Sequence, residues 1–285
     1  MADISFGIQQ YVLRDYINDE NSALGLYRAL KEMGYKSVEL CQFLMEKSSV
    51  EASAALGPES KLDWKHILNE AGLKVAGIHE NFELIREDPK KYANEAIALD
   101  AKTIVAAAAL ETDFHIRQSI SKLASELNQT GKKLKKYGIQ LLYHTHHMEY
   151  VHPKEDSNPG FYYLSEEVDS QYVGFEFDVY WAQIAGVNPE KEIARLGNRL
   201  ASIHLTDCTI SEPPEGSYER QPIPTELGMG NMDVASIVKM AERAGCRSFI
   251  SEQHGNWRDG SVKKSSQINA SYLKDVLCAE TTSDL

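Results

Sequence analysis

The chain has 285 residues and is 42% hydrophobic, enough for a sizeable core in one α/β barrel or two ordinary domains. Its formal net charge of −12 disfavours binding to nucleic acid or to an acidic membrane surface. The 4 cysteines form no C-x-x-C pair, so we expect reduced thiols. The N-terminus lacks a basic region followed by an apolar core, and the apolar run at residues 104–110 is too short to span a bilayer. We therefore expect a cytoplasmic protein.

Short β-branched or aromatic runs alternate with longer helical patterns along the chain. Apolar residues three and four apart predict helices at 23–33, 116–137, 232–244 and 265–277. Glycine ends several of the helices, as in the Met33-Gly34-Tyr35 and Ala71-Gly72-Leu73 junctions. Repeated βα units predict a parallel sheet, and we expect residues 1–285 to form a single (β/α)8 TIM barrel domain. The predicted strands lie at residues 5–9, 37–40, 75–79, 103–107, 140–144, 172–177, 201–204 and 249–252.

Two segments rich in turn-forming residues follow predicted strands. Residues 211–224 come after the seventh strand and residues 151–160 after the fifth. We interpret both as long βα loops, which cover the catalytic face in a barrel. A disordered excursion is the alternative for residues 211–224.

Metal-type ligands stand at the ends of the later strands. His144 and His146 end the fifth strand and Glu149 follows in the loop. A carboxylate beside neutral imidazoles suits Mn²⁺, Mg²⁺, Co²⁺ or Zn²⁺, with manganese favoured. Further ligands are expected from the sixth, seventh and eighth strands, at Asp178, His204 and Glu252.

Each of these residues also has a structural interpretation. Asp178 could cap the helix that starts near Tyr180, and His204 could be a core histidine with satisfied hydrogen bonds. Glu252 could pair with an arginine such as Arg195 or Arg199. Glu176 lies on the same strand face as Asp178 but one pleat deeper, so it could support a ligand or form a buried ion pair.

Other polar residues end the first three strands. Gln9, Glu39 and His79 point to the same face of the predicted barrel and would suit hydrogen bonds to substrate hydroxyl groups. His254 follows Glu252 and is a fourth candidate for substrate contact. Neither G-x-x-x-x-G-K-[ST] nor G-x-S-x-G is present, so nucleotide-cofactor and serine-hydrolase functions have little support.

Motifs of one known family are found at residues 7–15, 143–150, 177–181, 185–189, 197–200, 204–207, 228–233 and 252–253. Taken together, they resemble the sugar phosphate isomerase/epimerase family of xylose isomerase-like TIM barrels over essentially the whole chain. The resemblance implies a metal site formed by Glu149, Asp178, His204 and Glu252, while strand position makes His144 the competing ligand on strand five. The sequence departs from the family pattern at Thr145, Thr206 and His254, where asparagine, lysine and aspartate are usual.

The resemblance implies a divalent-metal-dependent isomerase or epimerase that acts on a ketose, aldose or keto-polyol through an enediolate. Glu149 and Glu252, with His144 or His146, are the candidate acids and bases. The alternative is a metal-dependent lyase or dehydratase of a keto-sugar, such as an inosose dehydratase or a 3-keto-glycoside-cleaving enzyme. A metal-dependent endonuclease, which the charge disfavours, and a non-catalytic sugar-binding subunit are further alternatives. A small carbohydrate is the expected partner, and a homo-oligomer is compatible with the fold by analogy.

Overall fold

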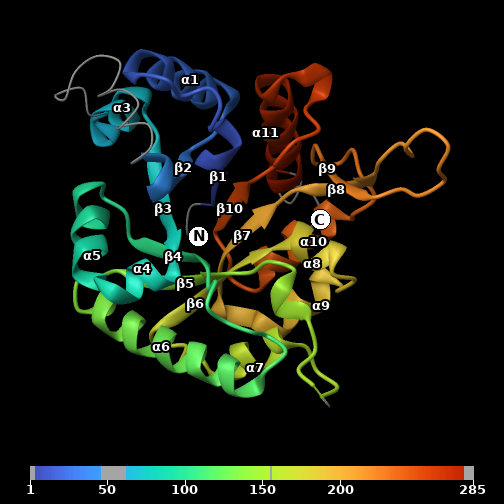
Figure 1. The fold of residues 1–285 in the computed structure, drawn as a ribbon. Helices are drawn as coiled ribbons and strands as arrows, with labels where there is room; N and C mark the ends of the chain where they lie inside the picture. Colours follow the sequence, from blue (N-terminus) through green and yellow to red (C-terminus); the bar gives the residue numbers. More distant parts are fainter. Residues whose placement is uncertain (1–3, 46–61, 155, 279–285) are drawn as a thin grey trace, which may run out of the picture.

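A closed barrel of eight parallel strands forms the centre of the molecule in the computed structural model, which describes residues 4–45, 62–154 and 156–278 (Figure 1). Around the barrel the order is β1, β10, β7, β6, β5, β4, β3, β2, so β10 closes the ring against β1. This confirms the predicted (β/α)8 TIM barrel and the position of all eight predicted strands. Their bounds are β1 Ser5–Gln9, β2 Ser37–Cys41, β3 Lys74–Asn81, β4 Thr103–Ala108, β5 Gln140–His144, β6 Val173–Asp178, β7 Leu200–Leu205 and β10 Ser248–Ser251.

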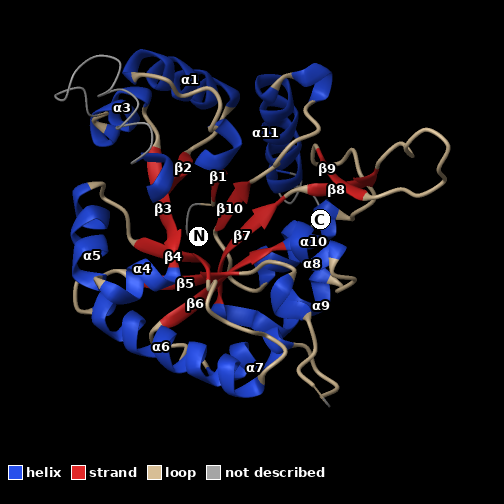
Figure 2. Cartoon of the chain, in the orientation of Figure 1, coloured by secondary structure: helices blue, strands red, loops and turns tan. Residues whose placement is uncertain are grey.

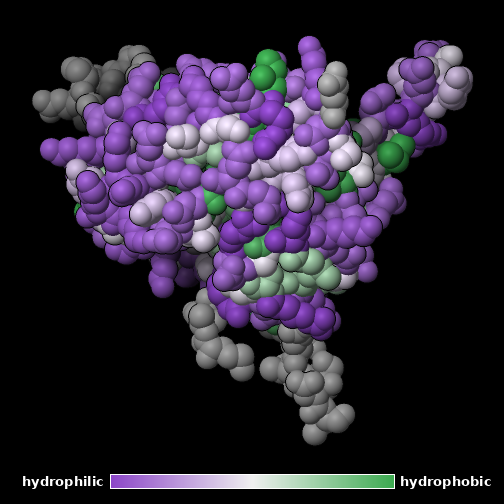
Figure 3. Space-filling model, turned by 90° about the horizontal axis from the view of Figure 1, so that it is seen from below, coloured by the Kyte–Doolittle hydropathy of each residue, from purple (hydrophilic) through white to green (hydrophobic). Residues whose placement is uncertain are grey.

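The helices lie outside the strands and surround them (Figure 2). Their apolar residues face the barrel: in α10, for example, Ile237, Val238 and Ala241 are buried. The face seen in Figure 3 is mostly hydrophilic, with small hydrophobic patches. No described helix is both long and apolar enough to cross a membrane. The helices are α1 Glu20–Met33, α3 Trp64–Ala71, α4 Phe82–Glu87, α5 Pro89–Ala98, α6 Arg117–Lys135, α7 Gly160–Glu167, α8 Val179–Ile184, α9 Pro189–Leu196, α10 Val234–Arg243 and α11 Val262–Cys278, with short 3₁₀ turns η1 Gln10–Leu13, η2 Met148–Tyr150, η3 Gly197–Arg199 and η4 Arg258–Gly260.

Glycine ends helices where the sequence predicted it. Gly34 follows α1 with φ 108° and Gly72 follows α3 with φ 71°. Both are left-handed caps whose amides donate to carbonyls of the preceding helix turn, a conformation that glycine adopts without strain. Each cap turns the chain directly into the next strand, so these glycines fix the repeating βα connection.

The segment after β7 differs from the predicted long loop. Strands β8 (Asp207–Ile210) and β9 (Pro222–Thr225) pair antiparallel and form a hairpin that projects from the barrel (Figure 1). The prolines at positions 222 and 224 suggested a loop, because proline cannot donate to a sheet ladder. A two-stranded hairpin tolerates them, since each of its strands has a free edge. Residues 211–221 form the connection between the two strands.

Candidate metal centre

Four side chains from consecutive barrel positions converge at the C-terminal end of the strands. His144 ends β5, Asp178 ends β6, His204 lies near the end of β7, and Glu252 follows β10. One ligand atom from each lies within 4.8 Å of the others, and all four side chains are buried. The register of neighbouring strands puts these residues at the same height in the barrel, since Asp178 of β6 lies opposite His204 of β7. We call these four residues the tetrad.

Two threonines hold the backbone of the tetrad carboxylates. The Thr145 hydroxyl accepts a hydrogen bond from the Asp178 amide at 3.0 Å. The Thr206 hydroxyl donates to the Glu252 carbonyl at 2.5 Å. Both threonines are buried, with exposed fractions of 0% and 3%. The two threonines, which replace the residues usual in the family, therefore hold the main chain at Asp178 and at Glu252, two potential ligands.

Asp178 combines the two interpretations that the sequence left open. Its Oδ1 accepts from the Trp181 amide at 2.9 Å and caps α8. Its Oδ2 lies 3.9 Å from Nδ1 of His204. One oxygen therefore starts a helix, and the other faces the tetrad.

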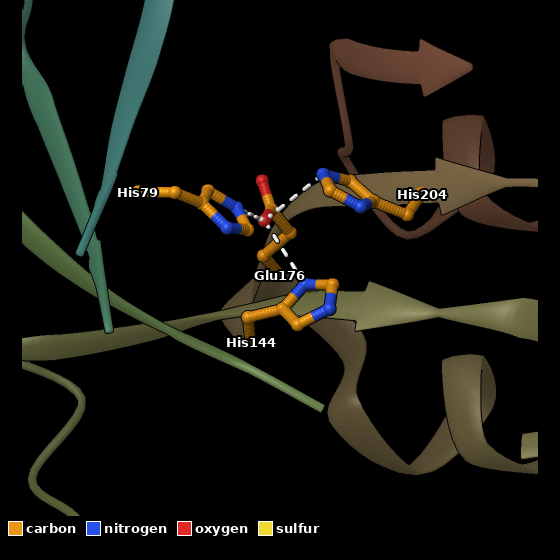
Figure 4. Close-up of side chains that lie close together, drawn as sticks. All are labelled: His79, His144, Glu176 and His204. Atoms are coloured by element: carbon orange, nitrogen blue, oxygen red, sulfur yellow. Dashed lines mark hydrogen bonds and ion pairs between the residues drawn. The ribbon is translucent and has the colours of Figure 1, made fainter. Parts of the chain in front are cut away.

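A deeper cluster lies below the tetrad, centred on Glu176. Its Oε1 is 2.6 Å from His79 Nε2, 3.1 Å from His144 Nδ1 and 3.0 Å from His204 Nε2. Figure 4 shows the three imidazoles pointing at this carboxylate. These four residues also form a group that could hold a metal ion. Since the cluster shares His144 and His204 with the tetrad, the two layers are coupled through both rings.

Glu39 and Gln9 complete this deeper layer. Glu39 Oε2 lies 2.6 Å from His204 Nε2 and 3.1 Å from His79 Nε2. Gln9 Nε2 donates to the same oxygen at 2.9 Å. Gly77 makes room for the carboxylate, because a Cβ at that position would lie 3.2 Å from Glu39 Oε1. The structure thus places Gln9, Glu39 and His79, which we predicted to contact substrate, against one another and beneath the tetrad.

The electrostatics of the two layers indicate an excess of buried negative charge. Burial alone would lower the pKa of His79, but Glu39 and Glu176 outweigh it and raise the pKa to about 10. In the same way, Glu176 and Glu252 raise the pKa of His204 well above its usual value despite burial. Burial and the Glu252 charge raise the pKa of Asp178. Protons on these groups offset negative charge that a bound cation would otherwise compensate.

The tetrad fits a divalent cation by the chemistry of its donors. Two imidazole nitrogens and two carboxylates form a mixed set that suits Mn²⁺, Zn²⁺ and related ions. The two nitrogens of His204 face different layers: Nδ1 is 2.8 Å from Glu252, and Nε2 is 2.6 Å from Glu39. A histidine ligand whose second nitrogen donates to a carboxylate is the usual arrangement in metal sites.

Glu149 lies outside the tetrad. Its Oε1 accepts from the Tyr143 hydroxyl at 2.8 Å, and its Oε2 accepts from the His146 amide at 2.9 Å. Burial raises the pKa of Glu149 to about 7. It belongs to neither group of potential metal ligands found among the described residues. Its contacts anchor the segment between His144 and η2, and so they set the position of His146.

His146 and His254 lie beside the tetrad. The His146 ring is 4.7 Å from the His144 ring, measured between centroids. His254 Nε2 lies 3.3 Å from Glu252 Oε2. The arginines considered as partners for Glu252 pair elsewhere, Arg195 with Glu192 and Arg199 with Glu166.

Glu176 was expected either to support a ligand or to form a buried ion pair, because strand alternation puts it on the face of Asp178. The structure pairs its buried carboxylate with His79, His144 and His204. Tyr143 was not predicted to belong to the site, since its hydrogen bond to Glu149 depends on how the chain returns after β5. Asp207, three residues after His204 in sequence, is not directed at the tetrad. Its buried carboxylate accepts from the amides of Cys208, Gly228, Gly230 and Met232.

Solved structures of similar fold cover nearly the whole chain. A sugar phosphate isomerase/epimerase from Parabacteroides distasonis ATCC 8503 has a TM-score of 0.75 at 20% identity, covering 96% of this chain and 94% of that one. A probable 3-DHS dehydratase from Bacillus anthracis has a TM-score of 0.69 at 14% identity, covering 95% and 99%. D-allulose 3-epimerase from Methylomonas sp., in complex with D-allulose, has a TM-score of 0.64 at 14% identity, covering 96% and 97%.

At these identities the similarity to solved structures shows the fold alone. Among curated proteins, no sequence matches the chain. The family model for the xylose isomerase-like TIM barrel matches residues 27–269, which is most of the chain and includes every tetrad residue. The chain therefore belongs to the xylose isomerase-like TIM barrel family.

Proposed function

We propose that the protein is a divalent-metal-dependent isomerase or epimerase that moves a proton on the carbon next to the carbonyl of a ketose, aldose or keto-polyol. The observation that supports this most directly is the tetrad, two carboxylates and two imidazoles converging at the C-terminal end of the barrel. Active sites of TIM-barrel enzymes lie at this end. The family and its structural neighbours, which are mostly isomerases and epimerases, favour the same class of reaction.

His144, Asp178, His204 and Glu252 would hold the metal. When bound, it would act as a Lewis acid toward the substrate carbonyl. We favour His144 over Glu149 as the fourth ligand, because Glu149 already accepts two hydrogen bonds elsewhere. Manganese is our preferred ion, with magnesium, cobalt and zinc as alternatives.

The chain supplies acid and base groups from different strands. His146 follows β5 and His254 follows β10, and each lies beside a tetrad residue. Epimerisation needs one group to remove a proton and a second to return one, so groups carried by separate strands suit it. Glu149 would act indirectly, by holding the main chain at His146. A positioned acid or base contributes about 10²–10⁴-fold to the rate.

Elimination is the second candidate function. It shares the first proton transfer and differs because a β-substituent then leaves. His254, next to Glu252, would be available to donate a proton to that leaving group. The similar fold of a probable dehydratase is compatible with this alternative.

Solvent exchange would test the proposal. The metal-loaded protein is incubated in D₂O with D-fructose, D-allulose and scyllo-inosose, and the products are followed by NMR and mass spectrometry. Deuterium at the carbon next to the carbonyl, with an isomeric product, is the result expected. A product that has lost water would favour the dehydratase instead.

Variants connect that activity to the tetrad. Asp178→Ala and Glu252→Ala should both lose bound metal by elemental analysis and lose exchange. Glu70→Ala is the matched control, because Glu70 is exposed and forms a surface ion pair with Arg28 on the barrel exterior. A protein that takes up none of the four ions and exchanges no proton would contradict the proposal.

A further inference from the structure

Five ring side chains form a continuous line at the C-terminal end of the barrel. We call Phe43, Tyr11, His254, Trp181 and His146 the aromatic arc. Centroid distances along it are 6.3 Å from Phe43 to Tyr11, 5.5 Å to His254, 5.7 Å to Trp181 and 5.7 Å to His146. The members lie in the segments that follow β2, β1, β10, β6 and β5. These separations are typical of rings in contact.

The arc connects the tetrad to the surface. At its inner end, His146 lies 4.7 Å from His144 between centroids. In its middle, His254 Nε2 is 3.3 Å from Glu252 Oε2. At its outer end, Phe43 is 48% exposed. The line is longer than one sugar ring, so a monosaccharide held at the tetrad would leave the outer rings uncovered.

The inner half of the arc carries polar atoms that lack a partner. Trp181 Nε1 and His146 Nδ1 are buried and have no hydrogen-bond partner in the described part of the chain. Such atoms are rare in folded proteins because their desolvation is costly. An aromatic ring of the protein with an unpaired nitrogen suits a hydroxylated ring of a ligand. The C–H groups of the ligand would pack on the aromatic face, and a hydroxyl oxygen would bond to the nitrogen.

The outer half differs in chemistry. The Phe43 side chain is 48% exposed, and the Arg14 guanidinium lies over the Tyr11 ring at 4.2 Å from its centroid. Half-exposed phenyl surface next to a buried site is suited to an apolar planar group. The arc thus changes from rings with unpaired nitrogens near the tetrad to a half-exposed phenyl ring at the surface.

We propose that the aromatic arc is a subsite for a second ring, and that the substrate is a glycoside with an aromatic aglycone. This proposal rests on the proposed function, which places the sugar at the tetrad. The sugar would react there while the aglycone stacks on Tyr11 and Phe43. A glycoside has a blocked anomeric carbon, so interconversion of aldose and ketose is closed to it. Epimerisation beside a ring ketone, or elimination, remains open.

Binding without turnover tests the subsite. The metal-loaded protein is titrated by calorimetry with phenyl and methyl D-glucopyranosides, each as α and β anomers. Neither compound has a ketone, so the measurement does not depend on catalysis. We expect the phenyl glycoside of one anomer to bind about tenfold more tightly than its methyl counterpart. Equal affinities, or no detectable binding of any of the four, would overturn the proposal.

Variants assign the preference to the arc. Phe43→Ala should reduce the phenyl preference by about five- to tenfold and leave methyl glycoside binding unchanged. Tyr218→Ala is the matched control, because Tyr218 is 91% exposed at the tip of the β8–β9 hairpin. A preference that survives Phe43→Ala would place the aglycone elsewhere and overturn the assignment. A phenyl preference without any solvent exchange on keto-sugars would contradict the proposed function and leave the subsite intact.

Discussion

Glu39 Oε2 lies 2.6 Å from Nε2 of His204, whose Nδ1 in turn lies 2.8 Å from Glu252 in the tetrad. The imidazole is thus held between a carboxylate of the deeper layer and one of the tetrad. A proton on Nε2, donated to Glu39, leaves Nδ1 free to bind a cation. Because Glu39 also accepts from Gln9 at 2.9 Å, its own orientation is fixed.

Replacing Glu39 by glutamine should weaken metal binding without removing a ligand. The amide retains the shape of the side chain but loses the charge that orients and polarises His204. Substitutions of such supporting groups cost about 10–100-fold in metal affinity. Competition titration with a chelator measures the effect, and Glu70→Gln on the exterior is the control. Unchanged affinity in Glu39→Gln would show that His204 is oriented without it.

The fourth ligand can be identified by comparing two variants. His144→Ala should lose bound metal, since the structure brings this imidazole to the other three tetrad residues. Glu149→Gln should keep metal near the wild-type level, because Glu149 is occupied by Tyr143 and the His146 amide. Elemental analysis after dialysis gives both answers. The reverse pattern would restore Glu149 as the ligand, as the family resemblance implied.

Much of the barrel could be predicted from sequence because its determinants are local. Runs of β-branched residues, helical spacing and glycine at helix ends such as Gly34 are read within a few positions. Strand topology then brings Asp178, His204 and Glu252 to one end without further information. The alternation of polar residues along β6 also contained the signal for Glu176, two residues before Asp178.

The rest depended on contacts between distant segments. Glu149 and His144 could not be separated as ligands, since that choice depends on the hydrogen bond between Tyr143 and Glu149. Gln9, Glu39 and His79 were correctly placed on one face by strand position. Whether they meet a substrate or one another depends on side-chain lengths across the barrel. The hairpin of β8 and β9 was missed because pairing between its strands overrides the loop preference of its prolines.

Glu149 should make stability depend on pH. Its pKa is raised by burial from 4.5 to about 7 in the folded protein. Between these values the folded state binds more protons than the unfolded state, so the free energy of unfolding falls as pH rises through the window. The full effect is about 3 kcal/mol, absent below the lower pKa and complete above the upper one.

Urea unfolding of the metal-free protein across this pH range measures the slope. Glu149→Gln cannot titrate, so its free energy of unfolding should fall less between the two pKa values than that of the wild type. Glu70→Gln, altered at an exposed carboxylate, should retain the wild-type slope. Parallel curves for Glu149→Gln and the wild type would show that this carboxyl does not control the effect.

The turn before α10 depends on the buried carboxylate of Asp207. Gly228 and Gly230 donate their amides to its Oδ2 at 3.0 Å each, and Met232 donates to Oδ1 at 3.1 Å. A Cβ on Gly230 would clash with the Asp207 side chain and with the Cys208 carbonyl. Since main chain and a fully buried side chain meet there, neither can move aside cheaply.

Gly230→Ala should therefore destabilise the fold by about 2–3 kcal/mol. The informative comparison is Gly25→Ala, because Gly25 lies inside α1, and apart from the helix's own backbone no described atom lies within 4 Å of an added Cβ. That variant should gain up to about 1 kcal/mol, as alanine favours a helix interior more than glycine does. Chemical unfolding of both variants gives the sign of the change in the free energy of unfolding for each. If Gly230→Ala were as stable as the wild type, the turn could form without close contact to Asp207. The four hydrogen bonds from main-chain amides to Asp207 would then not be what holds the hairpin and α10 in place.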